Sequence, residues 1–117
     1  MTLPISFIVN LLLPLFMAAA LFHHGWANYD QTTELDYTGV VQEIAYENPH
    51  GILKLAHEGK TWTVVLAPTS RMRDRGLTAD MIQPDDTVRV VGYPHKEVEN
   101  EMRVERIYVG DKKFELR

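Results

Sequence analysis

Histidine is the side chain in this sequence with the widest scope for chemistry. The 117 residues contain five histidines and no cysteine. Two short motifs, HHGW near the start of the chain and NPH in its middle, contain three of them: His23, His24 and His50. Neutral imidazole is the commonest protein metal ligand and suits copper, zinc and nickel. We therefore predict a metal site at these three residues. Because a structural zinc site usually has four protein ligands, the site is expected to be open or poor in ligands.

The position of His23 favours copper among these metals. If a leader is removed before Leu21, the mature chain begins Leu21-Phe22-His23. A free α-amine, two backbone amides and an imidazole at the third position form a square-planar set of four nitrogens. That geometry favours Cu(II) or Ni(II). Cleavage one residue away would abolish this set, in which His24 is a neighbour and not a necessary ligand.

The remaining histidines and the methionines are expected to have structural roles. His57 ends a predicted strand beside a turn, and His95 follows Pro94 in a predicted loop, so we expect both to be solvated. Three methionines follow residue 20: Met72, Met81 and Met102. Thioether sulfur selects Cu(I), but none of them lies within a few residues of a histidine. Packing in the core is therefore the expected role of all three.

Catalytic groups are sparse after the first twenty residues. Without cysteine there is no disulfide, no thiolate metal site and no cysteine nucleophile. Ser70 lies in a basic stretch that lacks histidine, and Glu43 and Glu47 share a face of a strand that is expected to be exposed. Because nucleophilic catalysis needs a nucleophile beside a base, we predict a protein that is not an enzyme.

Charge argues against nucleic acid as a partner. The net charge is −4 and no basic block is present, whereas phosphate backbones are bound by clustered lysine and arginine. Arg71, Arg73 and Arg75 alternate with other residues in one stretch. On a short helix they would fan out over less than one and a half turns. This pattern predicts that the three arginines lie on a solvated face of the helix. Binding of an anionic ligand by the helix is the alternative.

The first twenty residues differ in character from the rest. They contain no charged side chain, so all 12 Lys and Arg and all 16 Asp and Glu follow them. The apolar run closes in small residues, with Ala18 and Ala20 in the small-x-small pattern, which predicts a signal peptide at 1–20 and export to the periplasm. Residues 3–22 are also long enough to span a bilayer, so an uncleaved membrane anchor is the alternative.

The remaining elements predict one small β domain. Residues 21–33 have no sustained period and are expected to be an extended segment, which Trp26 and Tyr29 hold against the domain. Within 34–117, alternating apolar residues between turn signals predict strands. The expected strands are 34–47, 52–57, 61–66, 87–93, 102–109 and 113–116, with a short helix at 68–76 and another turn of helix within 77–82.

The order of three strands, a helix and two further strands is typical of a five-stranded Greek-key barrel of the OB type. A small open β-sandwich is the alternative. In the first strand, Leu35 and Tyr37 share one face, whereas Val40 and Ile44 share the other. This change at Gly39 predicts a β-bulge that bends the strand.

The motifs also carry a family resemblance. HHGW at 23–26, TGVV at 38–41, NPH at 48–50, RG at 75–76 and PDD at 84–86 are similar to the motifs of an exported bacterial family, domain of unknown function 6152. The resemblance spans nearly all of residues 23–109. It implies export and a small β-barrel, and it brings no established activity. Gly25 and Asp85 depart from the family pattern, where serine and glycine are usual, and neither departure removes a histidine.

Two functions follow as hypotheses. The leading one is an exported, non-enzymatic metal-binding module with copper favoured. The alternative is a metal-free envelope module whose barrel binds another ligand, in which the histidines cap turns and hold the N-terminal segment in place. An enzyme with an open metal site is a third interpretation, for which the sequence offers no partnered acid or base.

Overall fold

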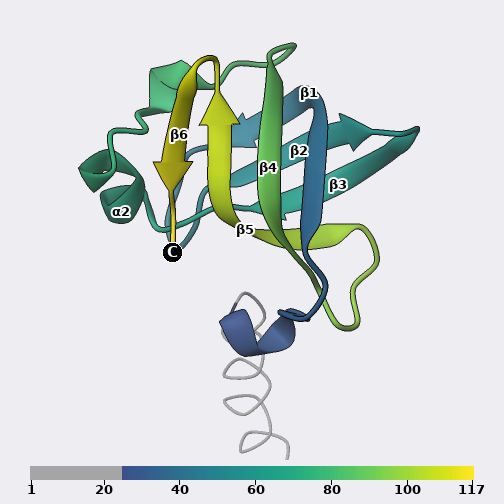
Figure 1. The fold of residues 1–117 in the computed structure, drawn as a ribbon. Helices are drawn as coiled ribbons and strands as arrows, with labels where there is room; N and C mark the ends of the chain where they lie inside the picture. The colour runs from purple at the N-terminus through teal and green to yellow at the C-terminus, as the bar shows by residue number, and fades with distance from the viewer. Residues whose placement is uncertain (1–24) are drawn as a thin grey trace, which may run out of the picture.

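The strands expected from the apolar alternation are present in the computed structural model, which describes residues 25–117. Figure 1 shows a mainly β structure with one short α-helix. In chain order the elements are η1 (Trp26–Asn28), β1 (Leu35–Ala45), β2 (Ile52–His57), β3 (Lys60–Val65), α2 (Thr69–Asp74), η2 (Ala79–Met81), β4 (Thr87–Pro94), β5 (Glu101–Val109) and β6 (Lys112–Glu115). The predicted signal segment at 1–20 lies outside the described residues.

Five of the strands close into a barrel. The sheet order is β3-β2-β1-β4-β5-β6, and β3 also pairs with β5. This closing contact is parallel and runs from Thr63–Glu101 to Val65–Arg103, whereas the other ladders are antiparallel. β6 lies outside the closed set, on the free edge of β5 (Figure 1). The prediction of a mainly β barrel with one short helix is confirmed, and closure excludes the open sandwich.

The predicted bulge is present in β1 but at a different residue. The register against β2 shifts between Val41 and Glu43, not at Gly39. Val41 is buried, whereas Val40, which the alternation grouped with Ile44, is 41% exposed. The two adjacent valines look equivalent in sequence, so the pattern alone misplaced the change of face.

Gly39 is needed for a different reason. A Cβ at this position would overlap the carbonyl oxygen of Ala56 and would lie 2.9 Å from Cγ of Leu55. Both residues belong to β2, so the missing side chain lets β1 and β2 approach closely where β1 leaves β4. Glycine inside a strand often marks such an approach.

The core is apolar and includes the helix. Met72 of α2 is fully buried, and a Cβ on Gly51 would lie 2.6 Å from its Cε. Met102 is also fully buried and Met81 packs against the core, which confirms the packing role expected for the methionines. The helix begins after Pro68 and is followed by Gly76 at a φ of +88°, as the helix-boundary preferences of these residues predict.

Candidate histidine site and N-terminal clasp

His50 is the described member of the predicted metal site, because His23 and His24 lie outside the described residues. It follows the cis peptide bond between Asn48 and Pro49. Its side chain is partly buried, and its Nδ1 atom is inaccessible to solvent. The loop that carries it is fixed on one side by Thr69, whose hydroxyl donates a 2.8 Å hydrogen bond to Oδ1 of Asn48.

Backbone hydrogen bonds fix the other side of this loop. Gly51 donates to the carbonyl of Ala67 at 2.9 Å and accepts from the amide of Leu66 at 2.8 Å. A side chain on Gly51 would point at Met72 and Leu66 in the core. The backbone one residue after His50 is therefore fixed beside the core.

His50 lies at the same end of the barrel as the start of the described chain. Ile52, two residues after His50, pairs with Val65 of β3, and Val65 pairs with Arg103 of β5. The guanidinium of Arg103 lies 4.6 Å from the ring centroid of Trp26. Neighbouring strands are about 4.8 Å apart, so roughly two strand spacings separate Ile52 from Arg103, the residue that contacts Trp26.

Trp26 is held by two arginines and a tyrosine. The guanidinium carbon of Arg117 lies 4.3 Å from the indole centroid, and that of Arg103 lies 4.6 Å from it. Tyr93 meets the indole edge-on, with 6.2 Å between ring centroids. Each cation–π contact of this kind stabilises by about 0.5–2 kcal/mol. We call Trp26, Arg103 and Arg117 the tryptophan clasp.

Tyr29 fastens the same segment one turn further on. It is 1% exposed, and its hydroxyl donates a 2.6 Å hydrogen bond to Oε2 of Glu101. Burial, with the hydrogen bond to Glu101, raises the pKa of Tyr29 far above its usual range. Backbone bonds from Asp30 to Pro94 and from Lys96 to Asn28 complete the attachment. The prediction that Trp26 and Tyr29 hold the N-terminal segment on the barrel is confirmed.

The prediction that His57 is solvated is wrong. Its side chain is 16% exposed, and its ring stacks on Tyr37 with 4.1 Å between centroids. Nδ1 donates to the carbonyl of Thr38 at 2.8 Å. Tyr37 and Thr38 belong to β1, so these partners come from a strand nineteen or twenty residues earlier, and the local sequence of a strand end gives no sign of them.

The same prediction is wrong for His95. Its Nδ1 accepts hydrogen bonds from the backbone amides of Glu97 at 3.1 Å and Val98 at 3.0 Å. The ring also meets Tyr29 edge-on at 5.0 Å. His95 therefore organises the β4–β5 loop and connects it to the N-terminal segment.

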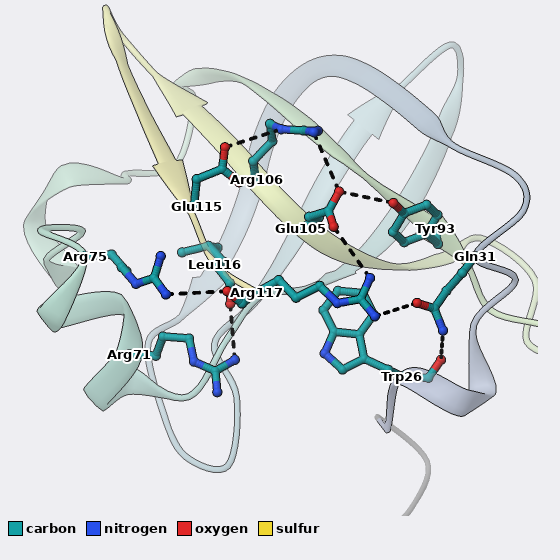
Figure 2. A network of polar contacts seen from close by, with 10 residues as sticks. All are labelled: Trp26, Gln31, Arg71, Arg75, Tyr93, Glu105, Arg106, Glu115, Leu116 and Arg117. Carbon is teal, nitrogen blue, oxygen red and sulfur yellow. Dashed lines mark hydrogen bonds and ion pairs between the residues drawn. The ribbon is translucent and has the colours of Figure 1, made fainter.

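A second polar network joins α2 to the last residues (Figure 2). Arg71 donates to the carbonyl of Leu116 at 3.3 Å, and Arg75 donates to the carbonyl of Arg117 at 3.5 Å. Arg117 in turn donates to Gln31 at 2.6 Å and pairs with Glu105 at 3.5 Å. The expected solvated face is therefore correct for exposed Arg73 but not for Arg71, which is partly buried.

Within residues 25–117, no group of three or more His, Cys, Asp or Glu side chains is arranged to hold a metal ion. A three-histidine site would therefore need at least one ligand from the preceding residues. The same part of the chain also contains no helix with the length and apolar character required to cross a membrane. Glu43 and Glu47 are exposed, as expected.

Together these features define a small closed β-barrel whose N-terminal segment is clasped onto its outer surface. The chain belongs to DUF6152, a family of unknown function, whose model matches residues 12–103. This confirms the resemblance drawn from the histidine and turn motifs. A search of curated proteins finds no match.

Solved structures of TiaS contain a similar fold. The ZRD-deleted mutant of TiaS in complex with agmatine matches with a TM-score of 0.51 and 18% identity, over 75% of this chain and 25% of that one. A TiaS–tRNA–ATP complex matches with a TM-score of 0.51 and 17% identity, over 76% of this chain and 20% of that one. This chain thus corresponds to a quarter or less of TiaS. At this identity the likeness concerns the fold alone.

Proposed function

We propose that this protein is an exported, periplasmic metal-binding module that is not an enzyme, with copper as the favoured metal and His23, His24 and His50 as its ligands. One observation carries the proposal: the strand that begins two residues after His50 pairs through β3 with β5, whose Arg103 contacts Trp26, the residue two positions after His24.

The reach of the chain supports this arrangement. His24 and His23 precede Trp26 by two and three residues. An extended chain covers up to about 3.5 Å per residue, so these residues reach roughly 7–10 Å from the clasp before side-chain length is added. That reach is comparable with the roughly two strand spacings between Ile52 and Arg103, which lie near His50 and Trp26 respectively. In this arrangement the clasp would keep His23 and His24 within reach of His50.

Copper is favoured on the chemistry of the donors. An all-nitrogen set suits Cu(II), which lies at the top of the affinity order for divalent first-row metals. A chain that begins at Leu21 would add its α-amine and two amides at His23. Export, and cleavage before Leu21, rest on the uncharged run at 1–20. The strand order further supports an OB-type Greek-key barrel, a fold known for binding rather than for one chemistry. With net charge −4, nucleic acid is not a proposed partner.

Calorimetric titration of residues 21–117 with Cu(II), Cu(I), Ni(II) and Zn(II) tests the proposal. We expect Cu(II) to bind with sub-micromolar affinity, and the triple variant His23→Ala, His24→Ala, His50→Ala to lose at least tenfold of it. The matched control is His57→Gln, which removes an imidazole at the opposite end of β2 from His50 and should leave the affinity unchanged. Micromolar or weaker binding, or equal binding by the triple variant, would exclude the metal function.

The alternative is a metal-free barrel that binds another ligand of the cell envelope. A groove of about 290 Å³ on β1, β2 and β3 favours it; the groove is lined by Glu43, Ile44, Ala45, Ile52, Lys54 and Thr63. In this case His50→Ala lowers the melting temperature equally with and without a chelator. A metal function instead predicts a loss of stability that requires the metal, because a ligand stabilises only the state that binds it.

A further inference from the structure

The strand β6 forms a free edge of the sheet. It comes last in the strand order, and among the described strands it pairs with β5 alone (Figure 1). An unpaired edge strand presents backbone N–H and C=O groups that can pair with another chain. β3, at the other end of the order, is covered along 63–65, because β5 pairs with it there and closes the barrel. β6 is therefore where this sheet can be extended.

The backbone groups of two residues in β6 point away from β5. Opposite residues in an antiparallel pair alternate between positions that exchange backbone hydrogen bonds and positions that do not. The amide of Leu116 donates to the carbonyl of Glu105 at 2.8 Å, so the bonded positions of β6 are its even-numbered residues. The N–H and C=O groups of Lys113 and Glu115 then point to the free edge. Within residues 25–117, no other segment forms a backbone hydrogen bond with these groups.

The side chains at this edge are charged and exposed to solvent. Lys113 is 53% exposed and Glu115 is 46% exposed, with 3.5 Å between Nζ and Oε1. Phe114, which lies between them in the strand, is buried in the core, so the two charged side chains share the outer face. The arginines of α2 donate past the end of the strand, to the carbonyls of Leu116 and Arg117 (Figure 2).

The charges of this edge are self-complementary in one register. If two copies pair antiparallel about a two-fold axis at Phe114, Lys113 of each copy lies opposite Glu115 of the other. Both pairs are then bonded positions, and the outward N–H and C=O groups of both residues find partners. A shift of the axis to Lys113 or to Glu115 would instead place two like charges directly opposite each other, which destabilises a strand pair.

This arrangement differs from the usual protection of an edge. Charged side chains, above all lysines, normally keep edge strands from pairing. Here Glu115 follows Lys113 on the same face and offers a second copy the opposite charge. Glu115 also pairs with Arg106 at 3.6 Å, and a carboxylate can accept from several donors at once. We propose that β6 joins two copies of this chain edge to edge, in an antiparallel register centred on Phe114, as a symmetric dimer with one continuous sheet.

Sedimentation equilibrium of untagged residues 21–117 tests this dimer, and EDTA in the buffer makes the result independent of the metal proposal. The chain from Leu21 is used, since the whole core cluster lies between Val41 and Leu116. Because one edge of four residues is a small interface, we expect a Kd between about 10 µM and 1 mM. Absence of a dimer at about 1 mM would overturn the proposal.

Two charge reversals test the register. Lys113→Glu alone and Glu115→Lys alone each place like charges in both pairs, so each variant should dimerise at least about tenfold more weakly than the wild type. The matched control is Lys60→Glu, which makes the same charge change at the tip of the β2–β3 hairpin and should leave the Kd unchanged. Single variants that dimerise as tightly as the wild type would contradict the register.

Mixing the two variants separates charge pairing from loss of folding. In an equimolar mixture of Lys113→Glu and Glu115→Lys, every glutamate of one chain faces a lysine of the other. Heterodimers should therefore form with a Kd within about threefold of the wild-type value. The double variant Lys113→Glu, Glu115→Lys exchanges the two charges within one chain and should dimerise equally well. A mixture that associates no more tightly than the single variants would overturn the proposal.

Amide hydrogen exchange identifies the strand that pairs. Between dilute and concentrated samples, exchange at the amides of Lys113 and Glu115 should slow by at least about threefold, because the dimer gives both N–H groups an acceptor. The amides of Lys112 and Phe114 already bond to β5 and serve as internal controls, with little further change expected. Unchanged exchange at Lys113 and Glu115 in a sample that dimerises would assign the dimer to another surface and overturn the proposal.

Discussion

The hydroxyl of Tyr29 donates a 2.6 Å hydrogen bond to the carboxylate of Glu101, across 72 residues of sequence. Both residues are buried, at 1% and 5% exposed. The bond joins the N-terminal segment to the first residue of β5, where β5 meets β3 and closes the barrel. Attachment of the segment and closure of the barrel therefore depend on the same residue.

Tyr29→Phe removes this bond and keeps the ring. Because the buried carboxylate of Glu101 loses a donor, we expect the free energy of unfolding to fall by about 1–3 kcal/mol. Urea denaturation monitored by circular dichroism measures it. Tyr108→Phe, on the outer face of the same strand, is the matched control and should change stability by less than about 0.5 kcal/mol. A loss equal to that of the control would show that the bond contributes nothing to stability.

Gly39→Ala should lower the free energy of unfolding by about 1–3 kcal/mol. The new methyl group would overlap the backbone of Ala56, and the backbone of a paired strand moves aside less easily than a flexible side chain does. Thermal unfolding measures the change. Thr38→Ala, at the neighbouring exposed position, is the control and should lower the free energy of unfolding by less than about 1 kcal/mol. If Gly39→Ala melts at the wild-type temperature, β1 and β2 do not approach as closely as described.

Asp36 gives stability a defined pH dependence. Its two carboxylate oxygens accept hydrogen bonds from Arg89 at 2.8 and 2.7 Å, and these bonds lower the pKa of Asp36 below its usual value. The stability that this ion pair adds to the folded state is present above the unfolded pKa of Asp36, about 3.9. It is lost as the pH falls through the lower pKa of the folded state. Asp36→Asn should therefore melt below the wild type at pH 7, and the difference should shrink below about pH 4.

Melting curves from neutral to strongly acidic pH measure this difference. Asp111→Asn, in the exposed turn between β5 and β6, is the control and should follow the wild type throughout. A gap between Asp36→Asn and the wild type that stays constant with pH would contradict the assigned role of the ion pair.

His95 can be tested through its role as an acceptor. Asparagine can accept a hydrogen bond from the amide two residues further on, whereas alanine cannot. We expect His95→Ala to speed amide hydrogen exchange at Glu97 and Val98 by about tenfold and to lower stability by about 1 kcal/mol. His95→Asn should retain most of the protection at Glu97. Equal exchange in the two variants would show that Nδ1 does not organise the loop.

The local features of this fold were predictable and the distant contacts were not. The alternation of Leu53 and Leu55 between turn residues predicted β2 at its observed bounds, and Pro68 and Gly76 predicted the helix. Because residues 40 and 41 are both valine, the apolar alternation could not show at which residue the bulge lies. The partners of His57 and His95 come from other strands or from backbone amides, which single-residue patterns do not encode. Arg103 was not foreseen at all, because its role depends on Trp26, 77 residues earlier in the chain.

The contact between Trp26 and Arg117 has a practical consequence for any fusion to this protein. Arg117 lies against Trp26, so a sequence added after Arg117 emerges beside the clasped segment that follows His24 in the chain. An oligohistidine tag placed there would supply its own imidazoles to the same neighbourhood and imitate metal binding. The metal titration therefore calls for an untagged chain or for a tag inserted at the tip of the β2–β3 hairpin.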